Sequence, residues 1–152
     1  MGKKSKSAKT IKLENNWKSK TIEALEKDYW GEPEYDSHLV TTCHKLRKKQ
    51  LKDFDTEDLR IMIGQNIGLL YLIPLALEVL DDNILADGNF YEGDLLKAVL
   101  TSKPEFWKND VENWKRMCEI YERDKKLLDE DNTTKTIREG WYEAYAEFKK
   151  IN

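Results

Sequence analysis

The 152-residue sequence contains few residues that cross-link or constrain a chain: two cysteines, two histidines, three prolines and seven glycines. Cys43 and Cys118 could form a disulfide only if the fold brought them together, and two buried reduced thiols are the simpler interpretation. Little proline and glycine, with many leucines, lysines and glutamates, favours helices. No segment alternates strictly between apolar and polar residues, so no strand is predicted.

The sequence also lacks the residue patterns that carry out chemistry. His38 and His44 are six positions apart, on different faces of any helix, and no second pair of ligands completes a zinc site. Cys43 and His44 are adjacent, so their side chains point apart and do not form a nucleophile and base. Walker, G-x-G-x-x-G and G-x-S-x-G motifs are absent. The sequence therefore predicts no catalytic residue, no cofactor and no metal.

No apolar run is long enough to cross a membrane. The run at residues 67–77 spans 11 residues, whereas a helix needs about 20 to cross a bilayer. The basic residues 2–12 are not followed by the apolar segment of a secretory signal. We therefore expect a cytoplasmic protein without a membrane partner.

Charge is abundant and unevenly distributed. Charged residues make up 36% of the chain, and the net charge is −3. The first 20 residues contain seven lysines and one glutamate, so they carry +6 and the rest carries −9. We interpret residues 1–16 as a flexible lysine-rich tail and residues 17–152 as one helical domain. The acidic domain argues against nucleic-acid binding and suits a basic protein partner.

Residues 53–100 are the most apolar segment, and we expect the chain to fold around them. Gly64 and Gly68 indicate the end of one helix and the start of another. The second helix is predicted at about 68–80, and because it is apolar nearly all round it should be buried at the centre. Pro74 should kink this helix, unless the helix begins just before it.

Amphipathic patterns predict further helices on both sides of the central one. The predicted fold is therefore all-α, a single compact bundle of about seven helices. Before the central helix, we expect a first helix that starts near Ser19 and includes Tyr29, a second capped by Ser37, and a third capped by Asp55 or Thr56. After it, we expect a helix that begins at Gly93-Asp94 and another that begins at a capping box at Ser102–Glu105, with a break at Asn109. The last helix should begin at Thr133 or Thr134.

Two clusters allow either a structural or a functional interpretation. Trp107 and Trp114 could stack on a ligand or anchor an interface, but their helical spacing favours the core. The basic residues Lys45 and 47–49 could bind phosphate, but cations are also favoured at the carboxyl end of a helix. We predict the structural role in both cases.

Two central runs carry a resemblance to a known family. The runs DLRIMIGQNIGLLYLIPLALEVL (58–80) and DGNFYEGDLLKAVL (87–100), with a KLRKK lead-in at 45–49 and Pro-Glu-Phe-Trp at 104–107, closely resemble the core of bacterial immunity proteins of contact-dependent growth inhibition systems. The resemblance covers roughly residues 46–107 and does not extend to the first 43 or the last 42 residues.

The resemblance implies a specific partner. In such systems a large surface-displayed exoprotein delivers its C-terminal toxin domain into a neighbouring cell, and the immunity protein binds and blocks its cognate toxin. The toxin is often a nuclease, so an acidic surface could mimic its phosphate substrate. The candidate toxin-binding residues are acids in predicted loops: Glu32, Glu34 and Asp36 between the first two helices, and Asp81, Asp82, Asp87 and Glu92 around the central turn.

Other interpretations of the sequence are open. These acids could serve solubility alone, and recognition could use residues 107–152 instead. The chain could be a cytoplasmic adaptor or regulator whose basic tail contacts nucleic acid, or an enzyme whose carboxylates meet in the fold. The adaptor would show a salt-dependent gel shift lost with residues 1–12, and the enzyme a pocket holding two acids with perturbed pKa values. The sequence makes no prediction about self-association.

Overall fold

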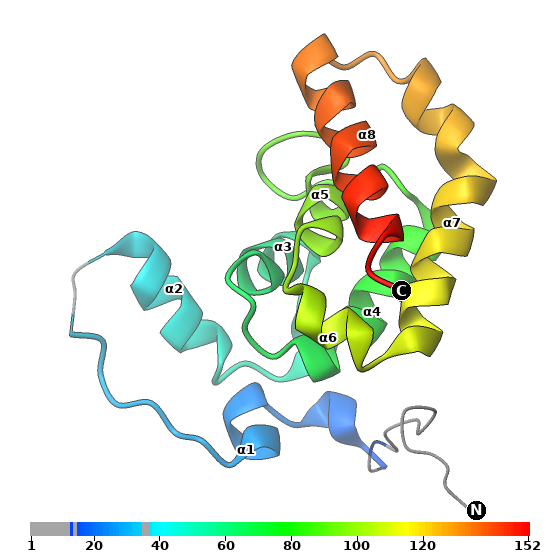
Figure 1. The fold of residues 1–152 in the computed structure, drawn as a ribbon. Coiled ribbons are helices and arrows are strands. Elements are labelled where there is room, and N and C mark those ends of the chain that lie inside the picture. Colours follow the sequence, from blue (N-terminus) through cyan, green and yellow to red (C-terminus); the bar gives the residue numbers. More distant parts are fainter. Residues whose placement is uncertain (1–12, 14, 35–36) are drawn as a thin grey trace, which may run out of the picture.

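The computed structural model describes residue 13 and residues 15–34 and 37–152. Within these ranges the chain forms eight α-helices and two short 3₁₀ helices, and no strand, which confirms the all-α prediction (Figure 1). The predicted tail falls mostly outside the described residues, so its flexibility stays a prediction.

The helices follow the predicted order, and the predicted break at Asn109 is present. Their bounds are η1 (Trp17–Ser19), α1 (Ile22–Glu26), α2 (His38–Leu46), η2 (Leu51–Asp53), α3 (Thr56–Gly64), α4 (Leu69–Asp82), α5 (Asp94–Leu100), α6 (Pro104–Lys108), α7 (Val111–Glu130) and α8 (Lys135–Lys149).

Helices α4 and α5 lie at the centre of the molecule. α4 contacts α3, α5 and α7, and α5 contacts α3, α4 and α8. The prediction of a buried central helix is therefore confirmed by α4, which contains Pro74 in its interior and so does not begin beside it. The apolar side chains that these two helices bury are Leu69, Leu72, Ile73, Ala76, Leu77, Leu80, Leu95, Leu96, Val99 and Leu100.

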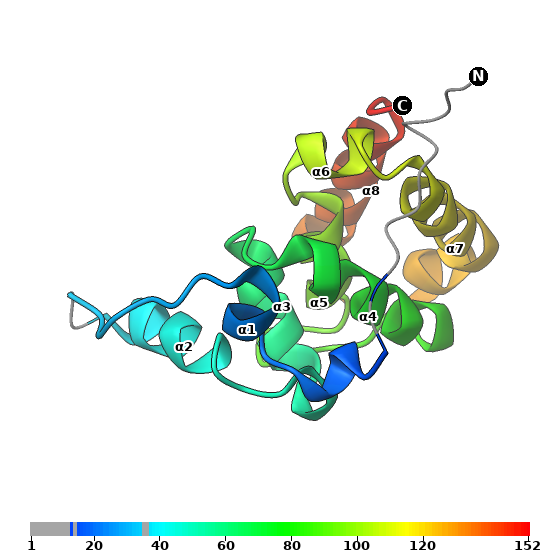
Figure 2. The same ribbon diagram turned by 90° about the horizontal axis from the view of Figure 1, so that it is seen from below.

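The remaining helices cover this centre from two sides (Figures 1 and 2). α1 and α2 lie on one side, where α2 contacts α3, and α7 and α8 form a helical hairpin on the other. The short helix α6 contacts α7. The hairpin and the α1–α2 segment are thus at opposite ends of the molecule.

Most predicted helix starts are confirmed by side chains that cap them. Asp55 and Asp58 form a reciprocal capping box at α3, Ser37 accepts a hydrogen bond from the Val40 N–H at α2, and Thr134 caps α8. These caps satisfy backbone N–H groups that lack a partner in the first turn of a helix.

The predicted first helix is wrong in extent. α1 is capped by Thr21 and begins at Ile22, three residues after Ser19, and it ends at Glu26, where Lys27 adopts a left-handed conformation with φ of 57°. Tyr29 lies beyond the helix and is 66% exposed, so it does not contribute to the predicted apolar face.

The predicted capping box at Ser102 is also wrong. The Ser102 hydroxyl donates to the Val99 carbonyl at 2.6 Å and accepts from the Trp107 indole N–H at 2.9 Å. It is therefore used to satisfy a buried indole, and α6 begins with Pro104 at its first position without a side-chain cap. A proline suits that position because its missing N–H would have no partner there.

Trp107 belongs to the core, as predicted, and Trp114 is half-buried and packs against the core. Trp107 is fully buried and packs edge-on against Phe148, and the Trp114 indole N–H donates to the Phe148 carbonyl at 2.9 Å. Both residues therefore fix the end of α8 against α6 and α7.

Gly93 provides a test of this packing. It has φ of 85°, and a Cβ atom there would lie 2.3 Å from the Trp141 ring. Gly93→Ala should lower the free energy of unfolding by about 2 kcal/mol or more, through backbone strain and overpacking. Urea unfolding measures the difference.

Gly64→Ala is the matched control for this substitution. A Cβ atom at Gly64, the last residue of α3, would meet nothing within 4 Å, so this variant should be unchanged or more stable by up to about 1 kcal/mol. Equal effects of the two substitutions would contradict the packing described for Gly93.

Candidate functional site

The connection between α4 and α5, residues 83–93, is held by the buried carboxylate of Asp94. Its Oδ1 atom accepts a hydrogen bond from the Gly88 N–H at 2.7 Å. Its Oδ2 atom accepts from the Phe90 and Tyr91 N–H groups at 3.0 and 3.3 Å. Asp94 is only 4% exposed, so these donors supply the partners that a buried charge requires. We call residues 83–93 the α4–α5 loop.

Two residues of α3, Glu57 and Arg60, also hold this loop in place. Arg60 donates to both carboxylate oxygens of Glu57 at 2.7 and 2.6 Å, and its Nε atom lies 3.7 Å from the Asp94 carboxylate. Glu57 also accepts from the Asn89 N–H at 2.8 Å. The hydrogen bond from Arg60, with a smaller contribution from Asn89, keeps the pKa of Glu57 below its usual range. The loop is thereby fixed to α3 by ionised groups.

The loop is also joined to the α7–α8 hairpin. The Trp141 indole N–H donates to the Gly93 carbonyl at 3.1 Å, and an isolated antiparallel bridge joins Asp87 and Glu92 within the loop. Ile84 is fully buried. Helices α3, α5 and α8 therefore all contribute to the conformation of the loop.

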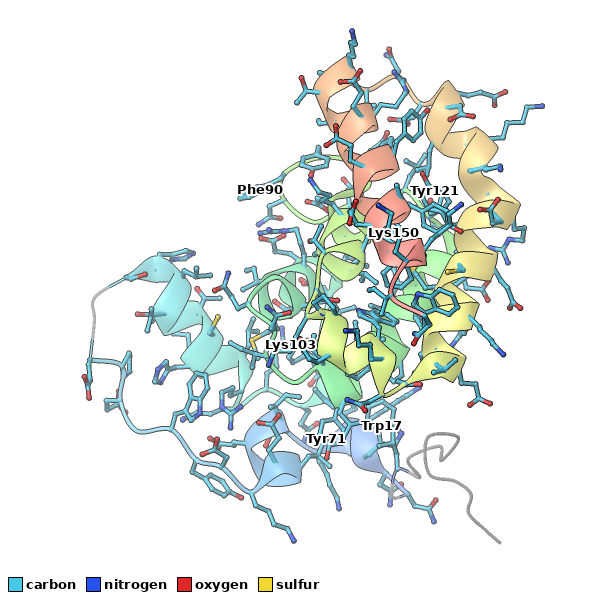
Figure 3. All side chains as sticks on the ribbon, viewed as in Figure 1. Trp17, Tyr71, Phe90, Lys103, Tyr121 and Lys150 are labelled. Atoms are coloured by element: carbon cyan, nitrogen blue, oxygen red, sulfur yellow. The ribbon has the colours of Figure 1, made fainter. Side chains whose placement is uncertain are left out.

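Phe90 lies at the outer side of this loop and is 71% exposed (Figure 3). The Arg60 guanidinium lies 4.2 Å from the centre of its ring, a cation–π contact. A large apolar side chain is thus displayed to solvent on a conformation determined by hydrogen bonds beneath it.

Three carboxylates gather beside the loop. A hydrogen bond with Asp131, and then the negative charges of Asp131 and Asp87, raise the pKa of Glu92 above its usual range. In the part of the chain that the structure describes, no ion pair joins any of the three to a lysine or arginine. We call Asp87, Glu92 and Asp131 the acidic cluster.

Asp81 and Asp82, the other two predicted acids of the central turn, are the last two residues of α4. Asp81 pairs with Arg123 of α7 at 2.6 Å, so its charge is partly neutralised. Asp82 and Asp87 line one shallow hollow together with Glu78 of α4. Of the four predicted acids, the loop residues Asp87 and Glu92 are thus the two that belong to the acidic cluster.

Glu32 and Glu34, of the first group of predicted acids, lie in the α1–α2 segment, on the side of the molecule away from the α7–α8 hairpin (Figures 1 and 2). Glu32 and Glu34 are exposed, and Asp36 lies outside the described residues. The fold therefore does not bring the described acids Glu32 and Glu34 together with the acids of the central turn into one surface patch.

Arg47 holds this segment, a role that helix-end charge did not predict. It is 2% exposed, donates to Glu26 at 2.7 Å and to the Asp28 carbonyl, and stacks at 4.3 Å on the Trp30 ring. The neighbouring Lys48 and Lys49 pair with Glu23 and Asp58. Three of the four cations of the basic cluster at the end of α2, Arg47, Lys48 and Lys49, therefore form pairs that hold neighbouring elements, and Lys45 is exposed.

Phe90, Asp94 and the Glu57–Arg60 pair are not predicted from the sequence as parts of a possible site. An aromatic residue inside the polar turn Asp-Gly-Asn-Phe was the available signal for Phe90. The sequence indicates Asp94 only as the start of a helix, since spacing does not show which backbone donors a side chain reaches.

The enzyme alternative requires a hollow with two perturbed acids. Among the described residues, the acids whose pKa values depart from the usual range pair with Arg60, Asp131, Lys125 and Arg123, and none lines the larger hollows. The described ranges contain no group of three metal-ligating side chains. Nor does any helix in those ranges have the length and apolar character needed to span a membrane.

A family model for CDI immunity proteins, those of contact-dependent growth inhibition, matches residues 24–117. The match covers well over half of the chain, so the chain belongs to the CDI immunity proteins, a family whose members neutralise a cognate toxin. The matched residues include both groups of predicted acids and the whole α4–α5 loop. Searches of curated proteins and of solved structures found no match.

The acidic cluster makes a prediction about pH. Because the folded chain raises the pKa of Glu92, its contribution to stability is greatest below pH of about 4.5 and is lost as pH rises through the folded value. Glu92→Gln, which cannot ionise, should therefore raise the melting temperature at pH 7 and leave it unchanged at pH 4.

Glu143→Gln, at an exposed glutamate of α8 outside the acidic cluster, is the control and should have the same small effect at both pH values. A Glu92→Gln variant that is less stable than the parent at pH 7 would show that Glu92 contributes a favourable ionised contact instead.

Proposed function

We propose that this chain binds and neutralises the C-terminal toxin domain of a large surface-displayed exoprotein in the cytoplasm of the cell that makes both. Membership of the CDI immunity proteins is the observation that carries the proposal. The toxin is a basic nuclease in this proposal, and the immunity protein acts by covering the surface that the nucleic acid would occupy.

The charge of the chain supports the nuclease part of the proposal. Residues 21–152 carry −9, and a surface of that sign attracts a protein that has evolved to bind phosphates. Complementary charge speeds the encounter and rejects wrong partners more than it adds affinity. Acids at the surface would therefore select the toxin, while the buried helices of the centre hold them in place.

Two groups of acids are proposed as toxin contacts. Asp81, Asp82, Asp87 and Glu92 lie at the α4–α5 loop and the end of α4 that precedes it, and Glu32, Glu34 and Asp36 belong to the α1–α2 segment. The first group is the stronger candidate because Glu92 and Asp87 have negative neighbours instead of a cation. A basic partner would supply the cation that the described part of the chain does not.

Calorimetry against the C-terminal domain of the large exoprotein encoded beside this gene tests the proposal. We expect one-to-one binding with a dissociation constant in the nanomolar range or below, and loss of nucleic-acid degradation at equal concentrations of the two proteins. No binding at micromolar concentration would contradict the proposed partner. Binding without nuclease activity in the free toxin would contradict the proposed chemistry alone.

Charge reversal then locates the contact. Glu92→Lys should weaken binding about tenfold or more, chiefly through a slower association rate, because it places like charges against the toxin. Glu143→Lys on α8 is the matched control and should have little effect. The opposite ranking of the two variants would place recognition on the C-terminal helices.

A further inference from the structure

Phe90 is the most exposed of the large apolar side chains in the described ranges. Its exposure is not the result of a poorly ordered segment, since the backbone on both sides is hydrogen-bonded. The Phe90 N–H itself donates to the buried Asp94 carboxylate, and the neighbouring Asn89 N–H donates to Glu57. The fold thus presents an aromatic ring outward on a supported turn.

The support extends to residues that a change of loop conformation would disturb. A Cβ atom at Gly88 would lie 2.2 Å from the Glu57 carboxylate, so the turn approaches α3 closely. Ile84 is fully buried and Ala86 is 7% exposed. The entropy of ordering this loop is therefore lost on folding and does not have to be lost again on binding, which favours affinity.

The surroundings of Phe90 define the chemistry of a partner. One side of the ring contacts the Arg60 guanidinium, which is neutralised by Glu57 and Asp94. Asp87 and Glu92 belong to the same loop, three positions before and two positions after Phe90 in the sequence, and no described cation forms an ion pair with either. An exposed apolar group on a loop that also carries two acids fits an apolar depression with lysine or arginine at its border, and aromatic residues at the centre of an interface carry much of its affinity.

We propose that Phe90 is the apolar anchor of the toxin interface, inserted into a depression of the basic toxin domain while Asp87 and Glu92 contact basic side chains at its border. The inference rests on the proposed function and identifies its contact surface. The proposal also separates two kinetic roles: Phe90 slows dissociation of the complex with the toxin, and the carboxylates accelerate its association.

Tyr29 provides a matched control. It is 66% exposed, close to the value for Phe90, but it belongs to the α1–α2 segment at the other end of the molecule. If exposed aromatic area alone governed binding, truncating either residue would have the same effect. The proposal requires the effect to be confined to Phe90.

The experiment compares wild type, Phe90→Ala, Phe90→Leu and Tyr29→Ala in binding to the toxin domain. Phe90→Ala should raise the dissociation constant about 30-fold or more, mainly through faster dissociation, and Phe90→Leu should retain part of the affinity. Tyr29→Ala should bind within about twofold of wild type. Melting temperatures should agree within about 3 °C, since Phe90 is an exposed residue.

The outcomes distinguish the two levels of the proposal. If wild type binds and Phe90→Ala binds equally well, the anchor is wrong and the proposed function stands. If wild type does not bind, the proposed function fails as well. A wild-type dimer that Phe90→Ala dissociates, without effect on toxin binding, would assign the ring to self-association and overturn the anchor. Should Phe90→Ala not fold, Phe90→Leu and Tyr29→Ala still give the comparison.

Discussion

The buried carboxylate of Asp94 is the constraint on which the arrangement of the α4–α5 loop depends. A carboxylate removed from water costs several kcal/mol unless it is paired and hydrogen-bonded. Three backbone N–H groups of the loop and the guanidinium of Arg60 meet that requirement. The need to satisfy one charge thereby joins α3, α5 and the preceding loop, and it determines which way Phe90 points.

The molecule divides into a centre that provides stability and a surface where charges oppose stability. α4 and α5 bury apolar side chains against their neighbours. In the acidic cluster, by contrast, three carboxylates lie together and the pKa of Glu92 is raised by its neighbours. Repulsion between neighbouring charges, which lowers the stability of the fold, is expected where a surface is selected for binding rather than for folding. That interpretation agrees with membership of a toxin-neutralising family.

Most of the fold could be predicted because its signals are local in sequence. The caps at Ser37, Asp55 and Thr134 and the apolar run in α4 identify the helices directly. Two side chains depart from their expected local roles because each contacts a residue farther away in the sequence. Ser102 bonds the Trp107 indole instead of capping α6, and Arg47 crosses to Glu26 instead of remaining at a helix end. The same limit applies to the candidate site. Its acids can be identified in the sequence, but the hydrogen bonds that hold the loop around Phe90 cannot.

Hydrogen exchange of the backbone amides in the α4–α5 loop tests the central claim most directly, that a pre-formed loop contacts the toxin. The account predicts slow exchange of the Gly88 and Phe90 amides in the free protein, because both donate to Asp94, and slower exchange still in the complex. Fast exchange in the free chain would contradict the pre-formed loop. Protection on toxin binding that excludes this loop would contradict its role as the interface.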